Sequence, residues 1–185
     1  MADQDKLGKI REKLGLIHLY CGDGKGKTTA AIGLAVRARG SGLNVLFVQF
    51  LKAGNSAELD PLRRLGVEVL SGQPTAKFIF QMTEEEKEEA RVFNRQRLED
   101  VIVRSQAGID LLILDETLGA IATDMIDEDR LLDFLTGKPP RLELVLTGRD
   151  PSDRLLEAAD YVSEVMMRKH PYETQGLGAR PGIEF

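Results

Sequence analysis

The residue types with the clearest chemistry lie close together near the N-terminus, in the segment Gly22-Asp23-Gly24-Lys25-Gly26-Lys27-Thr28-Thr29. Its glycines allow several backbone N–H groups to turn toward one anion without Cβ clashes, and a helix beginning there adds partial positive charge. Lys27 has the reach to contact terminal phosphates, and the Thr28 hydroxyl is placed to ligate Mg²⁺. We therefore predict that this loop binds the phosphates of a nucleotide.

The loop departs from the usual pattern G-x-x-x-x-G-K-[ST] in two respects. That pattern would put its first glycine at position 21, which is Cys21, whereas the glycine comes one residue later, at Gly22. A second lysine, Lys25, lies inside the loop. We interpret Cys21 as a small residue at a strand end, because thiol reactivity requires a specific electropositive environment.

Two adjacent carboxylates, Asp115 and Glu116, end a later apolar run at 111–114. Ligands bind at the carboxyl ends of strands in open α/β sheets, so one of these carboxylates is expected to hold Mg²⁺, directly or through water. We expect this strand to lie beside the strand at 16–20 that enters the loop. The alternative is an ordinary polar strand end before a helix.

Arginines offer further contacts to a nucleotide. Arg149 follows another apolar run, at 142–146, and is expected at the same edge of the sheet, where its guanidinium suits a phosphate or a ribose. A surface ion pair with Asp150 or Asp153 is the alternative. Arg37, on the helix after the loop, is open to the same two interpretations.

The elements that must position these residues alternate along the chain. Apolar runs predict strands at 16–20, 44–50, 67–70, 111–114, 142–146 and 161–167. Helical spacing and a Thr83–Glu86 capping box predict helices at 28–39, 83–107, 128–136 and 152–159. Together with the loop, this alternation predicts an α/β fold of the P-loop NTPase-like (RecA-like) kind, a mostly parallel β-sheet with helices on both faces.

The length of 185 residues favours one domain. We expect it to span 16–185, preceded by an amphipathic N-terminal segment at 1–15. Leu7, Ile10 and Leu14 share one face of that segment, which would lie on the domain or on a partner.

Composition excludes several classes of protein. The formal net charge of −5 argues against a sequence-independent nucleic-acid surface, which would be basic. No apolar run is long enough to predict a membrane span, and the N-terminus has no apolar signal core. The single cysteine fits a reducing compartment, so we expect a cytoplasmic protein.

Two histidines, His18 and His170, are isolated in the sequence and give no metal-ligand spacing. His18 is expected to be an ordinary strand residue with its hydrogen bonds satisfied.

Several segments, taken in this order, resemble the cob(I)alamin (corrinoid) adenosyltransferases of the CobA/BtuR/CobO type. They are the loop 22–31, Val48-Gln49-Phe50-Leu51-Lys52, Leu114-Asp115-Glu116, Leu146-Thr147-Gly148-Arg149, Ala159-Asp160-Tyr161-Val162-Ser163-Glu164, Lys169-His170-Pro171-Tyr172 and Ala179-Arg180-Pro181-Gly182-Ile183-Glu184-Phe185. The shifted loop together with this ending is specific to that family.

The resemblance implies that cobalt(I) of cobalamin or a related corrinoid attacks C5′ of ATP, takes the 5′-deoxyadenosyl group and releases triphosphate. ATP would lie reversed relative to ordinary phosphate-loop enzymes. Residues 22–29 would wrap the triphosphate, Lys27 would neutralise it, and Thr28 with Glu116 would bind Mg²⁺. Arg37 matches an arginine that helps to hold the nucleotide.

Phe78 matches one member of an aromatic pair that faces the corrinoid in this family and is thought to displace the lower cobalt ligand. The second aromatic is commonly Trp, whereas this chain has Phe80 and no Trp. The loop also carries Asp23 where Asn is common, and an acid near phosphates needs a cation or a contact other than phosphate.

The resemblance further implies a flavoprotein electron donor and a homodimer. Two other functions stay open: a small kinase or ATPase, and a non-catalytic module that binds ATP or a corrinoid. Cys21 at the first-glycine position counts against the kinase, which would have a regular loop.

Overall fold

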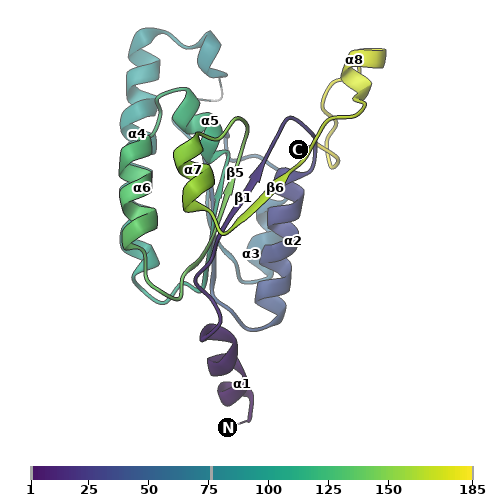
Figure 1. The fold of residues 1–185 in the computed structure, drawn as a ribbon. Helices are drawn as coiled ribbons and strands as arrows, with labels where there is room; N and C mark the ends of the chain where they lie inside the picture. Colours follow the sequence, from purple (N-terminus) through teal and green to yellow (C-terminus); the bar gives the residue numbers. More distant parts are fainter. Residues whose placement is uncertain (1, 76, 185) are drawn as a thin grey trace.

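Six strands, all parallel, form one sheet in the order β3-β2-β4-β5-β1-β6 (Figure 1). This computed structural model describes residues 2–75 and 77–184. The strands are β1 (Ile17–Cys21), β2 (Val45–Gln49), β3 (Glu68–Leu70), β4 (Leu111–Asp115), β5 (Glu143–Thr147) and β6 (Tyr161–Glu164). The six predicted strands are therefore confirmed, and the sheet is parallel throughout.

Helices cover both faces of the sheet, as predicted (Figure 1). The long ones are α1 (Ala2–Arg11), α2 (Lys27–Gly40), α4 (Glu84–Ser105) and α6 (Glu128–Gly137). The short ones are α3 (Leu59–Arg64), η1 (Ile79–Gln81), α5 (Thr117–Ala122), α7 (Asp153–Ala158) and α8 (Pro171–Gln175). Of these, α3, η1, α5 and α8 were not predicted. Helices α2 and α3 lie on one face, and α4, α5, α6 and α7 lie on the other.

Alternation within the strands divides the buried residues between two cores. In β4, Leu112 and Leu114 belong to the core beneath α4–α7, whereas Leu111 and Ile113 belong to the core beneath α2 and α3. All four side chains are at most 2% exposed. A parallel strand buried on both faces is expected to be a continuous apolar run, which is why this one was recognisable from the sequence.

The expectation that β4 lies beside β1 is wrong. Strand β5 lies between them, pairing Ile17 with Leu144 on one side and Leu111 with Glu143 on the other. After β4 the chain passes through α5 and α6 and then forms β5 between β4 and β1. One consequence is that Thr147, at the end of β5, separates the loop strand from the carboxylates at the end of β4.

Helix α1 packs on its own domain, at the end of the sheet opposite to the phosphate-binding loop (Figure 1). Leu7, Ile10 and Leu14 contact the core beneath α2. The guanidinium of Arg11 donates to both carboxylate oxygens of Asp110 at 2.8 Å. Of the two predicted positions for this segment, the structure thus has the one on the domain.

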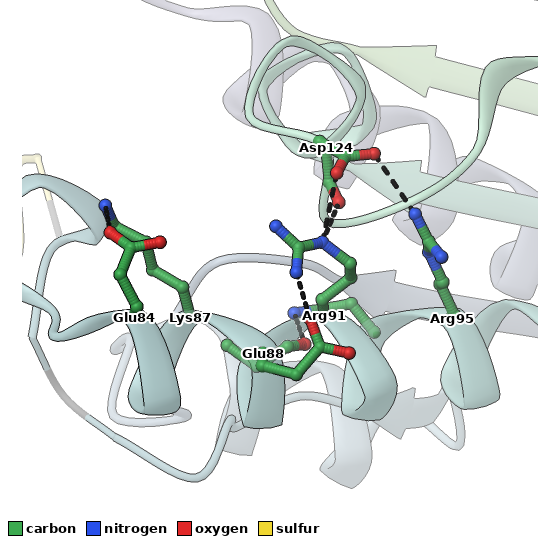
Figure 2. Close-up of polar contacts among 8 residues, drawn as sticks. Glu84, Lys87, Glu88, Arg91, Arg95 and Asp124 are labelled. Atoms are coloured by element: carbon green, nitrogen blue, oxygen red, sulfur yellow. Dashed lines mark hydrogen bonds and ion pairs between the residues drawn. The ribbon is translucent and has the colours of Figure 1, made fainter.

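Helix α4 begins at the predicted capping box: Thr83 Oγ1 accepts from Glu86 N–H, and Glu86 accepts from Thr83 N–H. Ion pairs then connect α4 to the turn after α5 (Figure 2). Arg91 Nε lies 3.0 Å and Arg95 Nη2 lies 3.1 Å from the Asp124 carboxylate. Exposed pairs of this kind contribute about 0–1 kcal/mol each, so their main effect is on the position of the turn.

The start of β5 is held by Glu143, which accepts from the backbone N–H groups of Gly15 and Leu16 at 2.8 and 2.9 Å. His18 Nε2 lies 2.7 Å from the same carboxylate, and the His18 ring stacks on Tyr161. His18 is therefore a strand residue with a hydrogen-bonding partner, as predicted.

We expect Glu143→Gln to lower the free energy of unfolding by about 1–3 kcal/mol at neutral pH, because a neutral amide with one acceptor oxygen replaces a charged carboxylate that accepts these hydrogen bonds. Burial tends to raise the pKa of Glu143, but the bonds from His18, Gly15 and Leu16 outweigh it, and the pKa lies below its ordinary 4.5. A lowered folded-state pKa stabilises the protein above the unfolded-state pKa, and that stabilisation is lost as pH falls through the folded-state pKa.

Urea unfolding near pH 7 and near pH 3 measures this difference. The gap between wild type and Glu143→Gln should narrow in acid, while Glu157→Gln, at an exposed site on α7, should change little at either pH. An equal loss for Glu143→Gln at both pH values would contradict this explanation.

Candidate active site

A cavity of about 590 Å³ opens at the carboxyl edge of the sheet, where the loop meets α5 and the C-terminal tail. It is lined by residues 23–29 and by Leu51, Lys52, Glu116, Gly119, Ala122, Thr123, Arg149, Asp150, His170, Ile183 and Glu184. A larger hollow of about 880 Å³ lies along α4, but apolar side chains and glutamates line it, so it does not suit an anion.

Close packing explains the late glycine of the loop. The loop lies against the chain that leaves β6, and Gly24 N–H donates to Val165 O at 2.7 Å. A Cβ on Gly22 would lie 2.6 Å, and one on Gly24 2.7 Å, from that carbonyl oxygen. Gly22 also has φ +100°, and Gly26, which precedes α2, has φ +123°, values that favour glycine.

Asp23 has a contact other than phosphate. Its Oδ1 accepts the backbone N–H of Met167 at 2.8 Å, so the carboxylate fastens the loop to the segment after β6. An acid in this loop needs either a cation or such a contact, and the structure has the contact.

Cys21, at the end of β1, is 5% exposed, and burial followed by the charge of Glu164 raises the pKa of its thiol. A thiol that is both buried and harder to ionise is a poor nucleophile. The interpretation of Cys21 as a packing residue is therefore confirmed.

Lys27 lies across its own loop. Its Nζ donates to the carbonyl oxygens of Gly22 at 2.7 Å and Gly24 at 2.8 Å. Burial, and then the positive charge of Arg149, lowers the pKa of Lys27. The ammonium group is thus positioned by backbone carbonyls, bonds that it can exchange for those to a phosphate.

A buried carboxylate connects the loop to the sheet. Asp115, with no exposed surface, accepts from Thr28 Oγ1 at 2.8 Å and from Thr147 Oγ1 at 2.7 Å through Oδ1. Its Oδ2 accepts from Gln49 Nε2 at 3.1 Å. Because the Thr28 hydroxyl gives its proton to Asp115, its oxygen lone pairs are available to a cation.

Glu116, and not Asp115, lines the cavity. It has the left-handed φ of 61°, and its backbone N–H donates to Thr147 Oγ1 at 3.0 Å. Burial, and then the charge of Asp115, raises the pKa of Glu116. A cation in the cavity would neutralise the Glu116 carboxylate. It would thereby lower the free-energy cost of burying that charge and of placing it beside Asp115.

Within residues 2–75 and 77–184, no group of three or more His, Cys, Asp and Glu side chains is arranged to hold a metal ion. A cation bound by Thr28 and Glu116 would therefore take its other ligands from phosphates and water, as Mg²⁺ commonly does.

Of the two arginines that were predicted to contact the nucleotide, one lines the cavity and the other does not. Arg149 lines the cavity, and among the described residues it has no ion pair with Asp150 or Asp153. Arg37 is exposed, about 15 Å along α2 from Lys27 by helix rise, and it does not belong to the described lining of the cavity. The structure therefore does not support Arg37 as a direct contact, and that role stays a prediction.

Phe78 and Phe80 form a pair outside the cavity. Their rings stack with centroids 5.5 Å apart and planes 5° apart. The side chains are unusually exposed for phenylalanine, at 68% and 83%. Two stacked, uncovered aromatic rings offer a flat apolar surface to a large ligand.

Sequence reasoning missed His170, Ile183 and Glu184 as lining residues. They belong to the tail, which returns to the loop over a large sequence separation; their only signal was their presence in the family-like segments. Leu51 and Lys52 had the same signal. Gly119 lines the cavity because α5, which was not predicted, brings it there.

The parallel sheet, the glycine-rich loop between β1 and α2, and the Thr28–Asp115 contact define a nucleotide-binding protein of the phosphate-loop class. A sequence profile described as ATP:corrinoid adenosyltransferase BtuR/CobO/CobP matches residues 13–185. The chain belongs to this family of transferases.

Named relatives agree with this assignment. The corrinoid adenosyltransferase CobA of Salmonella typhimurium is 32% identical, over 97% of this chain and 90% of its own length. The corrinoid adenosyltransferases of Pseudomonas aeruginosa and Escherichia coli K12 are 29% and 30% identical, over 98% and 97% of this chain. These two alignments cover 89% and 90% of the relatives.

A solved structure of EssC (ATPases 2 and 3) from Geobacillus thermodenitrificans gives a TM-score of 0.48 at 17% identity, over 92% of this chain and 36% of that one.

In the described part of the chain, no helix has the length and apolar character needed to span a membrane.

We expect Gly24→Ala to weaken ATP binding about tenfold or more, because the new Cβ would push the loop away from Val165. Overpacking of this kind typically costs about 1–3 kcal/mol of stability. Calorimetric titration and thermal unfolding measure the two effects.

Gly33→Ala is the matched control: Gly33 is exposed in α2, and among the described residues a Cβ there meets nothing within 4 Å. That variant should bind ATP normally and be no less stable. Similar losses in both variants would contradict the role given to the Val165 contact.

Proposed function

We propose that this chain binds ATP in the cavity and transfers its 5′-deoxyadenosyl group to the cobalt(I) of cobalamin or a related corrinoid, releasing inorganic triphosphate. The main support is that the loop brings Lys25 and Lys27 to one cavity, together with Lys52 and Arg149. Membership of the corrinoid adenosyltransferase family supplies the identity of the substrates.

The chemistry asks little of the protein as an acid or a base. Cobalt(I) is already a strong nucleophile, so no general base is required. The bond from C5′ to the α-phosphate oxygen breaks, and the triphosphate that leaves gains negative charge. Lys27 is proposed to exchange its loop carbonyls for phosphate oxygens and stabilise that charge, while residues 22–29 hold and aim the nucleotide.

Thr28 and Glu116 are proposed to hold Mg²⁺. They fit because the Thr28 hydroxyl is oriented by Asp115 and because Glu116 is a cavity-facing carboxylate with a raised pKa. The ion, when bound, neutralises part of the triphosphate charge.

Phe78 and Phe80 are proposed to face the corrinoid. Their exposure and stacking suit a flat macrocycle, and Phe80 would supply the second ring where relatives commonly have Trp. Phe78 would act by displacing the lower ligand of cobalt(II), which makes the metal easier to reduce.

We further propose a cytoplasmic homodimer that receives electrons from a flavoprotein. These proposals rest on the family resemblance. We keep residues 1–15 as an accessory segment and 16–185 as the catalytic domain, since the family profile begins only two residues after α1 ends.

The decisive experiment supplies ATP, Mg²⁺ and chemically reduced cobalamin and identifies the products. We expect adenosylcobalamin and triphosphate in equal amounts. ADP or phosphate without a cobalt–carbon bond would indicate a kinase or an ATPase. ATP binding without any product would indicate a non-catalytic module, and either outcome would refute the proposal.

We expect Phe78→Ala to spare adenosylation of cobalamin already reduced to cobalt(I), and to slow by tenfold or more (about 1.4 kcal/mol) the reaction that starts from cobalt(II) with a protein reductant. Val103→Ala is the matched control, because Val103 is 70% exposed against 68% for Phe78. Equal losses in the two assays would show that Phe78 does not act on the cobalt ligand.

A further inference from the structure

The C-terminal tail, residues 168–184, is fastened to the domain at one point. Within the described part of the chain, its single hydrogen bond or ion pair to any residue before 168 joins Glu184 Oε1 to Lys25 Nζ, at 2.8 Å. The other polar contacts of the tail are internal, such as the cap that His170 forms on α8. The tail thus closes on the phosphate-binding loop through the loop's extra lysine.

Arg180 orients the Glu184 carboxylate toward that lysine. The backbone N–H of Arg180 donates to Oε2 at 2.8 Å, and its guanidinium donates to both oxygens at 3.2 and 3.0 Å. With Arg180 as the first cause and Lys25 as the second, the pKa of Glu184 falls to about 2. The carboxylate is therefore ionised at any pH at which the enzyme would work.

The Glu184 carboxylate is thus a fixed anion in the cavity that is proposed to bind the triphosphate anion. Lys25, Ile183 and Glu184 all line the cavity, and Lys25 belongs to the loop that is proposed to wrap the triphosphate. If Lys25 kept both partners, a carboxylate and a phosphate would lie within a few ångströms of each other. Like charges at that distance repel, and the repulsion is strongest where solvent is excluded.

We propose that Glu184 competes with the triphosphate for Lys25. Phosphate binding would displace Glu184 and release the tail, and the return of Glu184 to Lys25 would weaken the hold on the triphosphate product. This inference rests on the proposed function, because it takes residues 22–29 as the triphosphate site.

The expected size of the effect follows from the exposure of the pair. The side chains of Lys25 and Glu184 are 46% and 22% exposed. Exposed ion pairs favour the paired state by a factor of about 1.5–5. A ligand that must first open such a pair loses about 2–6-fold in apparent affinity.

Calorimetric titration of the full chain with inorganic triphosphate and Mg²⁺ tests this competition. We expect Glu184→Gln to lower the dissociation constant about 2–6-fold relative to wild type. Glu173→Gln is the matched control, since Glu173 is an exposed tail glutamate whose side chain has no hydrogen bond or ion pair among the described residues. It should bind triphosphate like wild type.

A double-mutant cycle separates competition from a general loosening of the tail. In a Lys25→Gln background there is no lysine to compete for and the tail has lost its bond to the loop, so Glu184 is no longer held near the phosphates and adding Glu184→Gln should leave triphosphate affinity unchanged. A tighter complex in that background would overturn the competition, because the gain would not depend on Lys25.

Two further results separate a failure of the proposed competition from a failure of the proposed function. If wild type binds triphosphate and Glu184→Gln binds it equally or more weakly, the competition is refuted and the proposed function stands. If wild type does not bind triphosphate at all, the proposed function fails, and the competition fails with it.

Discussion

The close contact between the phosphate-binding loop and the chain leaving β6 sets the shape of the whole site. Gly24 N–H bonds to Val165 O, and Asp23 bonds to the N–H of Met167. The backbone of Val165 lies so close to the loop that there is no room for a Cβ at positions 22 and 24. The irregular position of the first glycine therefore has a steric cause, and the segment after β6 helps to shape the candidate nucleotide site as much as β1 does.

A second constraint is the buried Asp115, which joins three elements through Thr28, Thr147 and Gln49. Leaving such a carboxylate unpaired in the interior would be costly, so these hydrogen bonds hold the start of α2 against the ends of β5 and β2. Asp115 is thereby used inside the protein, and its neighbour Glu116 is the carboxylate left to face the cavity. Two adjacent acids have different roles because the backbone turns between them.

Most of the sheet and the phosphate-binding loop were predictable from local signals. Strands such as Leu111–Asp115 are continuous apolar runs, and α4 begins at a capping box that depends on residues three apart. The short helices α3, α5 and α8 have five or six residues and too weak a helical pattern to be recognised, whereas the equally short α7 was predicted. Since α5 was missed, so was the wall of the cavity that contains Gly119.

The main limit on prediction from the sequence was the spatial placement of residues that lie far apart in the chain. Nothing in the local pattern of β4 indicates that β5 will lie between it and β1, because strand order depends on how the crossovers pack. The Lys25–Glu184 pair joins residues separated by 159 positions, so no local pattern contains it. Asp23 was unexplained for the same reason, since its partner is Met167. Arg37 and Phe78 were assigned by resemblance alone, and their roles depend on ligands.

Attack at C5′, with the triphosphate as the leaving group, is tested most directly by ATP that carries a heavy oxygen isotope in the bridge between C5′ and the α-phosphorus. Mass spectrometry of the products then locates the broken bond. We predict that all of the label appears in the triphosphate, because adenosyl transfer breaks the carbon–oxygen bond. Label retained on the adenosine side would show that a phosphorus–oxygen bond breaks, and it would contradict adenosyl transfer by this protein.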